Sequence, residues 1–395
     1  MRRFPARSWP AVLALAGAAC TRPASAPVPS AAISASDLRA RLTAFAADSM
    51  MGREAGTIWN AKAAEYVASQ FAKLGLRPAG ENGTFFQVVP NIRARETGAL
   101  APARNVVAIL PGSDAALRGE YVSITAHNDH IGFNHQPVDH DSLRAYDTVI
   151  RPLGADSPRR QPTAAESVRI RTILDSVRRL RPARPDSIDN GADDDGSGTI
   201  GLIEIAQAFA RGPNKPRRSI LFVSHTAEEK GLLGSDYYTD HPTVPIDSIV
   251  AEIDIDMIGR GAATDLEGGG PTYLEVVGLR RLSNEFGDWL EAVNAREPTP
   301  FVFNYEYDVP GHPLQYYCRA DHYSYARYGI PSVSLSRGEH MDYHQVTDEA
   351  QYIDYPDFAR LTQLVFDGAL FVANADHAPR LSVPKPRDPH VRCRQ

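Results

Sequence analysis

Short apolar runs alternate with helical repeats over most of the chain beyond residue 104. Six runs have the length and apolar character of buried strands, at residues 105–110, 121–125, 219–223, 249–255, 273–277 and 331–335. Three segments repeat apolar residues at the helical period, at residues 198–211, 283–295 and 356–373. Strands that alternate with helices predict an α/β protein, a three-layer α/β/α sandwich around a mainly parallel mixed sheet.

The region before these strands has a helical pattern from Ser36 to about Val89. Ser36 is expected to cap one helix, and Gly75 ends a second helix with its own apolar stripe. We therefore predict that residues 36–95 form a helical segment packed on the core. Residues 376–395 are expected to be a C-terminal tail.

The N-terminus has the features of an export signal. Arg2 and Arg3 precede an apolar run, residues 9–19, that is too short to span a bilayer and ends at Cys20. Residues 1–20 are therefore predicted to be a signal peptide, with lipoprotein processing at Cys20 as one route. Gly17 stands where such signals usually carry Leu, so cleavage near residues 24–26 is the alternative.

The predicted location is outside the cytoplasm of a bacterium, in the periplasm, on the outer membrane or secreted. Residues 21–35 are rich in Pro, Ala and Ser and predict a flexible tether. A lipid on Cys20 would be the only membrane attachment. The other two cysteines, Cys318 and Cys393, imply no disulfide framework, and we do not expect them to pair. The net charge of −6 gives no reason to propose a nucleic acid partner.

Two adjacent acids, Glu228 and Glu229, follow the strand at residues 219–223. His127 and Asp256 stand at or just beyond the ends of two other strands. In mainly parallel sheets, ligands bind beyond the carboxyl ends of the strands, so these side chains are expected to meet. Asp194 in a Gly-rich loop and His344 near the C-terminus complete a set of imidazoles and carboxylates.

That set matches the donors that zinc prefers. We expect two zinc ions, with Asp194 bridging, His127 and Asp256 on one ion or shared, and Glu229 with His344 on the other. Two close cations activate a water and stabilise both oxygens of a tetrahedral intermediate.

Two acids that bind no ion complete the expected chemistry. Glu228, adjacent to a ligand but free, is the candidate base that passes a proton to the leaving amine. Asp129 is placed to hold the imidazole of His127 by its other nitrogen.

The order of these motifs resembles the co-catalytic zinc exopeptidases, a family with bacterial secreted aminopeptidases, aminopeptidase Y and glutamate carboxypeptidase. The resemblance rests on His127-x-Asp129, Gly191-Ala-Asp-Asp-Asp-x-Ser-Gly198, Ala227-Glu-Glu-x-Gly-Leu-Leu-Gly-Ser235, Asp256-Met-Ile-Gly259, Asp321-His322 and Tyr343-His-x-x-x-Asp348. It implies a dizinc peptidase domain at residues 104–375 with the ligand roles given above. It also implies that Tyr343 donates to the developing oxyanion.

A long insertion, about residues 133–188, separates two of the ligand motifs. Thr163 and Glu166 form a capping-box pattern at the start of an amphipathic helix. One interpretation is a surface loop with one docked helix. The other is a wall or lid over the site.

Several functional alternatives remain open. The leading hypothesis is an aminopeptidase acting on peptides. A carboxypeptidase or dipeptidase would need a cationic pocket, for which Arg319 and Arg337 are candidates, whereas an amine needs acids such as Glu339 or Asp321. A glutaminyl cyclase-like enzyme would use one zinc. A non-catalytic binding module is the alternative outside the enzymes.

Two further interpretations of the sequence concern metal ligands. Asp193, Asp195, Ser197, Gly198 and Glu204 fit the spacing of a calcium-binding loop, but the prolines and missing helical pattern of residues 181–189 and the helix start near Thr199 argue against one. His130 and His322 lie beside the motifs, and we expect them to make supporting hydrogen bonds rather than to bind zinc.

Overall fold

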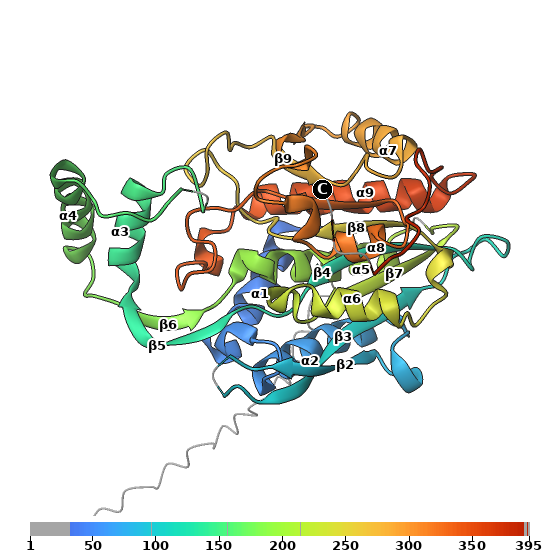
Figure 1. The fold of residues 1–395 in the computed structure, drawn as a ribbon, viewed down its shortest axis with the longest axis horizontal. Coiled ribbons are helices and arrows are strands. Elements are labelled where there is room, and N and C mark those ends of the chain that lie inside the picture. Colours follow the sequence, from blue (N-terminus) through green and yellow to red (C-terminus); the bar gives the residue numbers. More distant parts are fainter. Residues whose placement is uncertain (1–31, 96, 156, 214, 391–392, 394–395) are drawn as a thin grey trace, which may run out of the picture.

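The computed structural model describes residues 32–395 except 96, 156, 214, 391, 392, 394 and 395. A nine-stranded mixed sheet forms its centre, in the order β1-β3-β7-β4-β8-β11-β9-β10, with β2 paired to β3 (Figure 1). The strands are β1 (Arg77–Pro78), β2 (Phe86–Arg93), β3 (Leu100–Leu110), β4 (Tyr121–His127), β7 (Ser219–His225), β8 (Ile249–Ile255), β9 (Tyr273–Val277), β10 (Val302–Asn304) and β11 (Ser332–Ser336).

Helices cover both faces of the sheet. They are α1 (Ala35–Phe45), α2 (Ile58–Lys73), α5 (Gly198–Arg211), α6 (Leu233–Asp240), α7 (Asn284–Asn294), α8 (His322–Ala326) and α9 (Tyr355–Asn374). The apolar faces of α1, α2, α5, α7 and α9 share one core with the strands, and α6 and α8 pack on the opposite face. The predicted α/β/α sandwich is confirmed, because helices cover both faces of the sheet and strands such as β3 and β7 alternate their apolar side chains between the two cores.

The centre of the sheet is parallel and its flanks are not. β4 runs parallel to β7 and β8, and β8 runs parallel to β11. β3 is antiparallel to β7, and β9 is antiparallel to β11. The carboxyl ends of β4, β7, β8 and β11 therefore lie along one edge of the sheet.

The helical pattern predicted up to about Val89 is wrong over its last part. β2 is a strand that joins the main sheet beside β3. Its burial alternates along the first residues, with Gln87 and Val89 inside and Val88 outside. The sequence does not reveal this alternation, because one of the inward positions is the polar residue Gln87. Its amide can be buried because it donates to the backbone carbonyl of His241.

The insertion is an arm of two strands and two helices rather than a loop with one docked helix. We call β5 (Gly132–Asp139), α3 (His140–Ile150), α4 (Ala164–Arg178) and β6 (Pro185–Asp189), together with the loops that join them, the arm. β5 and β6 pair antiparallel, and α3 and α4 extend to one side of the molecule (Figure 1). The predicted capping box of Thr163 and Glu166 is present at the start of α4. The strands escaped prediction because β5 exposes most of its residues.

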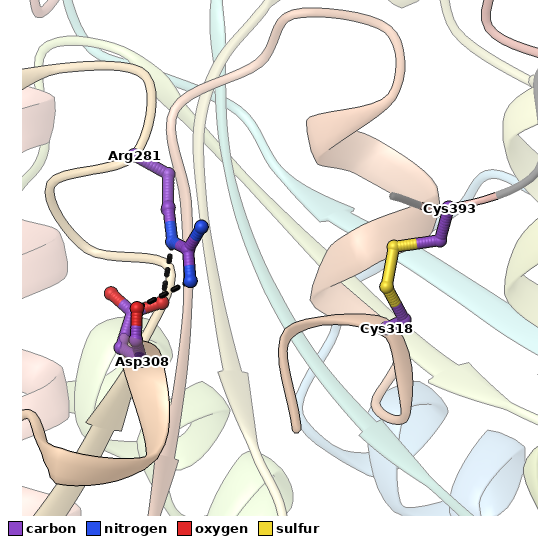
Figure 2. Close-up of a disulfide and its surroundings, with 4 residues drawn as sticks. All are labelled: Arg281, Asp308, Cys318 and Cys393. Carbon is purple, nitrogen blue, oxygen red and sulfur yellow. Dashed lines mark hydrogen bonds and ion pairs between the residues drawn. A yellow bond between two sulfur atoms is a disulfide. The ribbon is translucent and has the colours of Figure 1, made fainter. Parts of the chain in front are cut away.

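The expectation that Cys318 and Cys393 stay unpaired is wrong. They form a disulfide that joins the C-terminal tail to the turn Tyr316–Cys318 (Figure 2). Among the described helices, none is long and apolar enough to cross a membrane. The predicted signal peptide and most of the tether lie outside the described residues.

Candidate metal centre

Three strand ends bring the first predicted ligands together. His127 is the last residue of β4 and pairs with His225 at the end of β7. Asp256 follows β8 directly. Glu228 and Glu229 begin a single turn after β7, which the left-handed residue Ala227 (φ 57°) redirects. Because these strands are parallel, their carboxyl ends deliver all four side chains to one place.

Asp194 lies between the two predicted imidazoles. Its Oδ1 is 3.3 Å from His127 Nε2, and its Oδ2 is 3.0 Å from His344 Nε2. Asp194 is only 3% exposed. A carboxylate whose two oxygens face different imidazoles has the geometry of a bridging ligand.

The first group of donors surrounds His127. Asp256 Oδ1 lies 3.6 Å from His127 Nε2. Asp195 also lies within reach of these groups. However, the Asp195 carboxylate accepts hydrogen bonds from the backbone N–H groups of His127, Gly198 and Met257. We therefore assign Asp194 to the ligand set and Asp195 to a brace between strand ends.

The second group of donors surrounds His344. Glu229 Oε2 lies 3.0 Å from His344 Nε2. His130, which we expected only to support the ligands, joins this group, with donor atoms of all four residues within 4.8 Å of one another. His322 lies outside both groups and packs edge-on against Tyr317.

The structure agrees with the argument against a calcium-binding loop at residues 193–204. A strand, β6, precedes this segment instead of a helix. The carboxylate of Asp195 is occupied by backbone N–H groups, and Asp193 accepts from Gly259 N. Glu204 lies within α5 and pairs with Arg41 at 3.4 Å. These oxygens do not converge on one ion.

The donor atoms of both groups fit a metal centre. His127, His130, Asp194, Glu229, Asp256 and His344 each have a buried donor atom without a hydrogen-bond partner among the described residues. Such buried polar atoms are costly unless a cation or hydrogen bond satisfies them. Imidazole nitrogen and carboxylate oxygen are zinc donors, so the residues present fit a zinc centre.

The charges and the burial of this cluster shift the pKa values of its side chains. Burial alone would lower the pKa of His344, but contacts with Asp194 and Glu229 outweigh it and raise that pKa to about 11. Burial raises the pKa of Glu228 well above its usual value, against the attraction of His127. A carboxylate with a raised pKa is suited to accept a proton and return it.

Asp129 connects a ligand to the candidate base. Its Oδ1 lies 3.6 Å from His127 Nδ1 and accepts a hydrogen bond of 3.2 Å from Glu228 N. His127 Nδ1 also lies 3.2 Å from the backbone oxygen of Asp129. This places Asp129 behind the imidazole, where it orients the ring.

Arg53 is a buried residue of this centre that the sequence analysis did not single out. Its guanidinium donates to the carbonyl oxygens of Asn190 at 2.5 Å, Gly191 at 2.8 Å and Asn128 at 3.3 Å. Arg53 therefore ties the segment after His127 to the loop that carries Asp194. No local pattern marks such a residue, because its partners are backbone groups far along the chain.

A cleft of about 70 Å³ opens beside Asp194, Glu228 and Asp256. It is also lined by Met257, Glu275, Val277, Tyr316, Arg319, Ala320, Ser334, Ser336, Glu339 and Tyr343. Arg319 pairs with Glu339 at 2.8 Å. Arg337 does not reach the cleft, since its guanidinium binds the backbone of Tyr273 and Gly270. Asp321 is buried and absent from the cleft lining.

The cleft wall that contains Tyr316 and Arg319 is fastened on both sides. Cys318, which lies between these two residues in the chain, is bonded to Cys393 of the tail, and Arg281 Nε binds Asp308 at 2.7 Å (Figure 2). The guanidinium of Arg281 also lies 4.6 Å from the ring of Tyr317. These contacts hold the turn that presents Arg319.

The arm contacts the loop that carries Tyr343 and His344. Arg144 of α3 pairs with Asp342, and Arg151 donates to the carbonyl of Met341 at 3.1 Å. Arm residues also enclose a neighbouring hollow of about 320 Å³ that shares Glu275, Tyr316 and Glu339 with the cleft. Leu153, Ser157 and Pro158 are these arm residues. The part of the arm around α3 thus forms a wall beside the site, whereas α4, at the far end of the arm, stands apart from the site (Figure 1).

The chain belongs to peptidase family M28, whose family model matches residues 105–369, and this confirms the resemblance drawn from the motifs.

Two curated relatives are similar to parts of this chain. The chain is 30% identical over 153 residues to a probable leucine aminopeptidase 2 of Aspergillus oryzae, covering 38% of this chain and 28% of that protein. It is 31% identical over 174 residues to a leucine aminopeptidase 1 of Penicillium rubens, 42% of each. The chain thus spans less than half the length of these relatives.

Two solved structures share the fold. The LapA aminopeptidase of Legionella pneumophila aligns with a TM-score of 0.55 and 18% identity, over 87% of this chain and 73% of that one. The glutaminyl cyclase of Porphyromonas gingivalis aligns with a TM-score of 0.55 and 17% identity, over 85% and 97%. At these identities the likeness concerns the fold alone.

Proposed function

We propose that this protein is an exported aminopeptidase that holds two zinc ions and removes N-terminal residues from peptides. The observation that carries the proposal is the position of Asp194, whose two oxygens face His127 and His344 separately. Membership of family M28 and the similarity to leucine aminopeptidases support it.

The residues of the chain divide the chemistry among them. His127, Asp194 and Asp256 would hold one ion, and Asp194, Glu229 and His344 the other. Zinc supplies Lewis-acid activation of a water and of the scissile carbonyl. Glu228, whose Oε2 lies 4.0 Å from His127 Nε2, takes the proton of the attacking water and delivers it to the leaving amine.

Tyr343 is positioned to stabilise the oxyanion. Its ring lies against His344, with ring centroids 3.9 Å apart, and its side chain lines the cleft. Burial raises the pKa of the Tyr343 phenol well above its usual value, so it keeps its proton. A protonated phenol beside the scissile carbonyl donates a hydrogen bond to the developing negative charge.

The cleft favours a free amine over a free carboxylate. Arg319 is the guanidinium that lines it, and Glu339 already neutralises that charge. Glu275, in the middle of β9, adds a further acid, and it is 4% exposed. We propose that Glu275 and Glu339 receive the N-terminal ammonium group, which argues against a carboxypeptidase.

Export outside the cytoplasm is part of the same proposal. The Cys318–Cys393 disulfide supports it, because such bonds persist in oxidising compartments. The signal-like N-terminus and Cys20 point in the same direction. Mass spectrometry of the mature protein would show whether Cys20 carries lipid.

A panel of peptides with free or blocked ends, assayed with and without chelator, tests the proposal. Cleavage confined to free N-termini and abolished by chelator is expected. Cleavage at free C-termini would indicate a carboxypeptidase. Cyclisation of N-terminal glutamine with one zinc per chain would indicate a glutaminyl cyclase. Zinc binding without turnover of any peptide would favour the binding module.

A further inference from the structure

His130 lies in the second donor group, although the family resemblance gives it no role there. We propose that His130 is a fourth protein ligand of the ion held by Asp194, Glu229 and His344. This inference rests on the proposed zinc centre and makes its two sites chemically different.

Four distances describe the proposed ligand set. His130 Nδ1 lies 2.7 Å from Glu229 Oε1 and 3.6 Å from Asp194 Oδ2. His344 Nε2 lies 3.0 Å from Glu229 Oε2 and 3.0 Å from Asp194 Oδ2. Donors about 2.0–2.1 Å from a tetrahedral zinc are roughly 3.3 Å from one another. The observed separations scatter around that value.

A supporting hydrogen bond, the role we expected for His130, does not account for its surroundings. His130 is fully buried, and neither ring nitrogen has a hydrogen-bond partner among the described residues. Its Nδ1 is close to Glu229, but the pair lies outside hydrogen-bonding geometry. An imidazole that supports a ligand donates an N–H to that ligand, whereas an imidazole that is itself a ligand points a nitrogen at the same ion.

The backbone holds the His130 ring in this position. His130 N donates to the carbonyl of Arg53, and a backbone bridge joins His130 to Glu54. Gly191 (φ 54°) packs on the ring from the other side, where an added Cβ would lie 2.4 Å from His130 Cγ. Gly191 stands three residues before Asp194, so the loop that presents the bridging carboxylate also fixes His130.

The two sites then differ in openness. Asp194, Glu229, His344 and His130 make a complete tetrahedral set, as in structural zinc sites. His127, Asp194 and Asp256 make three donors and leave a position open, as in catalytic sites. Glu228 lies on the side of the open site, 4.0 Å from His127. The ion held by His130 is therefore expected to be the tighter one.

X-ray absorption of the zinc-loaded wild type tests the ligand directly. Three histidines on two ions give about 1.5 imidazoles per zinc, whereas two histidines give about 1.0. A value near 1.0 with two zinc ions bound would overturn the inference and leave the proposed function standing. Absence of zinc from the wild type would overturn both.

Titration with a chelator, followed by zinc analysis, tests the difference between the sites. The wild type should release its two ions in separate steps, and His130→Ala should lose the tighter step, with at least a 10–100-fold fall in affinity. His130→Asp, which restores an oxygen donor, should recover part of that affinity. His135→Ala in β5 is the control and should release zinc as the wild type does.

Circular dichroism of each variant separates loss of a ligand from loss of the fold. Wild-type zinc affinity at both sites in folded His130→Ala would overturn the inference. If His130→Ala does not fold, the absorption measurement on the wild type still decides it.

Discussion

Glu228 and Glu229 are neighbours in the chain, but their carboxylates face different groups. Glu229 Oε2 lies 3.0 Å from His344, whereas Glu228 Oε2 lies 4.0 Å from His127 and borders the cleft. The left-handed backbone of Ala227 begins the turn that separates the two side chains. One carboxylate is thus placed to hold an ion and the other to move a proton.

Glu228→Gln should remove the base and keep the metal. We expect kcat to fall by about 10²–10⁴-fold, because the amide cannot accept the proton of the attacking water. Zinc analysis should still find the wild-type content. Glu229→Gln is the matched variant, and it should lose zinc as well as activity. Near-wild-type kcat for Glu228→Gln would show that another group is the base.

Zinc affinity should rise with pH. Contacts with Asp194 and Glu229 raise the pKa of metal-free His344 to about 11, so this ligand carries an extra proton at neutral pH that zinc must displace. Raising the pH makes that displacement easier, by about tenfold in affinity per pH unit for each proton released. Competition with a chelator between pH 6 and 8 measures the slope. A flat dependence would show that the ligands are already deprotonated.

Arg144→Ala should weaken the loop that carries the last ligand. Arg144 pairs with Asp342, which also binds buried Arg260 at 2.7 Å. Removing the arm's contact should speed zinc loss and lower kcat, with little change in preference among peptides. Arg169→Ala, on exposed α4, is the control and should change neither. If Arg144→Ala retains zinc as the wild type does, the arm does not hold the ligand loop in place and serves only as a wall beside the cleft.

Glu275→Gln should weaken binding of substrates with a free N-terminus. Loss of a buried charge facing an ammonium group is expected to raise KM by about tenfold or more, from the 1.5–3 kcal/mol of a hydrogen bond to a charged group. Zinc content should not change, since Glu275 belongs to neither donor group. Glu267→Gln, in the neighbouring hollow, is the control. Equal KM values for both variants would exclude Glu275 as the amine site.

The convergence of the proposed ligands was predictable because most of them sit in local patterns. His127, Glu229 and Asp256 follow apolar strands, and a parallel sheet gathers strand ends at one edge. Asp194 stands in a Gly-rich loop before a helix with a clear apolar repeat. The order of strands and helices predicted the layers for the same reason.

What was not predictable depends on contacts between distant segments. The role of His130 follows from the path of the Gly191 loop across its ring. The pairing of Cys318 with Cys393, 75 residues apart, follows from where the tail returns. β5 and β6 stabilise each other by pairing across the whole insertion, and neither has a buried face that marks a strand.

Arg53→Met should destabilise the protein and loosen the metal centre. The substitution removes hydrogen bonds to three buried carbonyls, those of Asn190, Gly191 and Asn128. Gly191 O still accepts from Gly196 N, so the carbonyls of Asn190 and Asn128 are the ones that lose their Arg53 donor without a backbone replacement. Each buried group left unsatisfied costs about 1–3 kcal/mol, so we expect a loss of roughly 2 kcal/mol or more in the free energy of unfolding. Urea denaturation measures it. The exposed Arg93→Met is the control and should change stability by less than about 0.5 kcal/mol. Because Arg53 also joins the two ligand-bearing loops, zinc should stabilise the variant less than it stabilises the wild type. Equal stabilisation of both by zinc would show that Arg53 supports the fold without positioning the ligands.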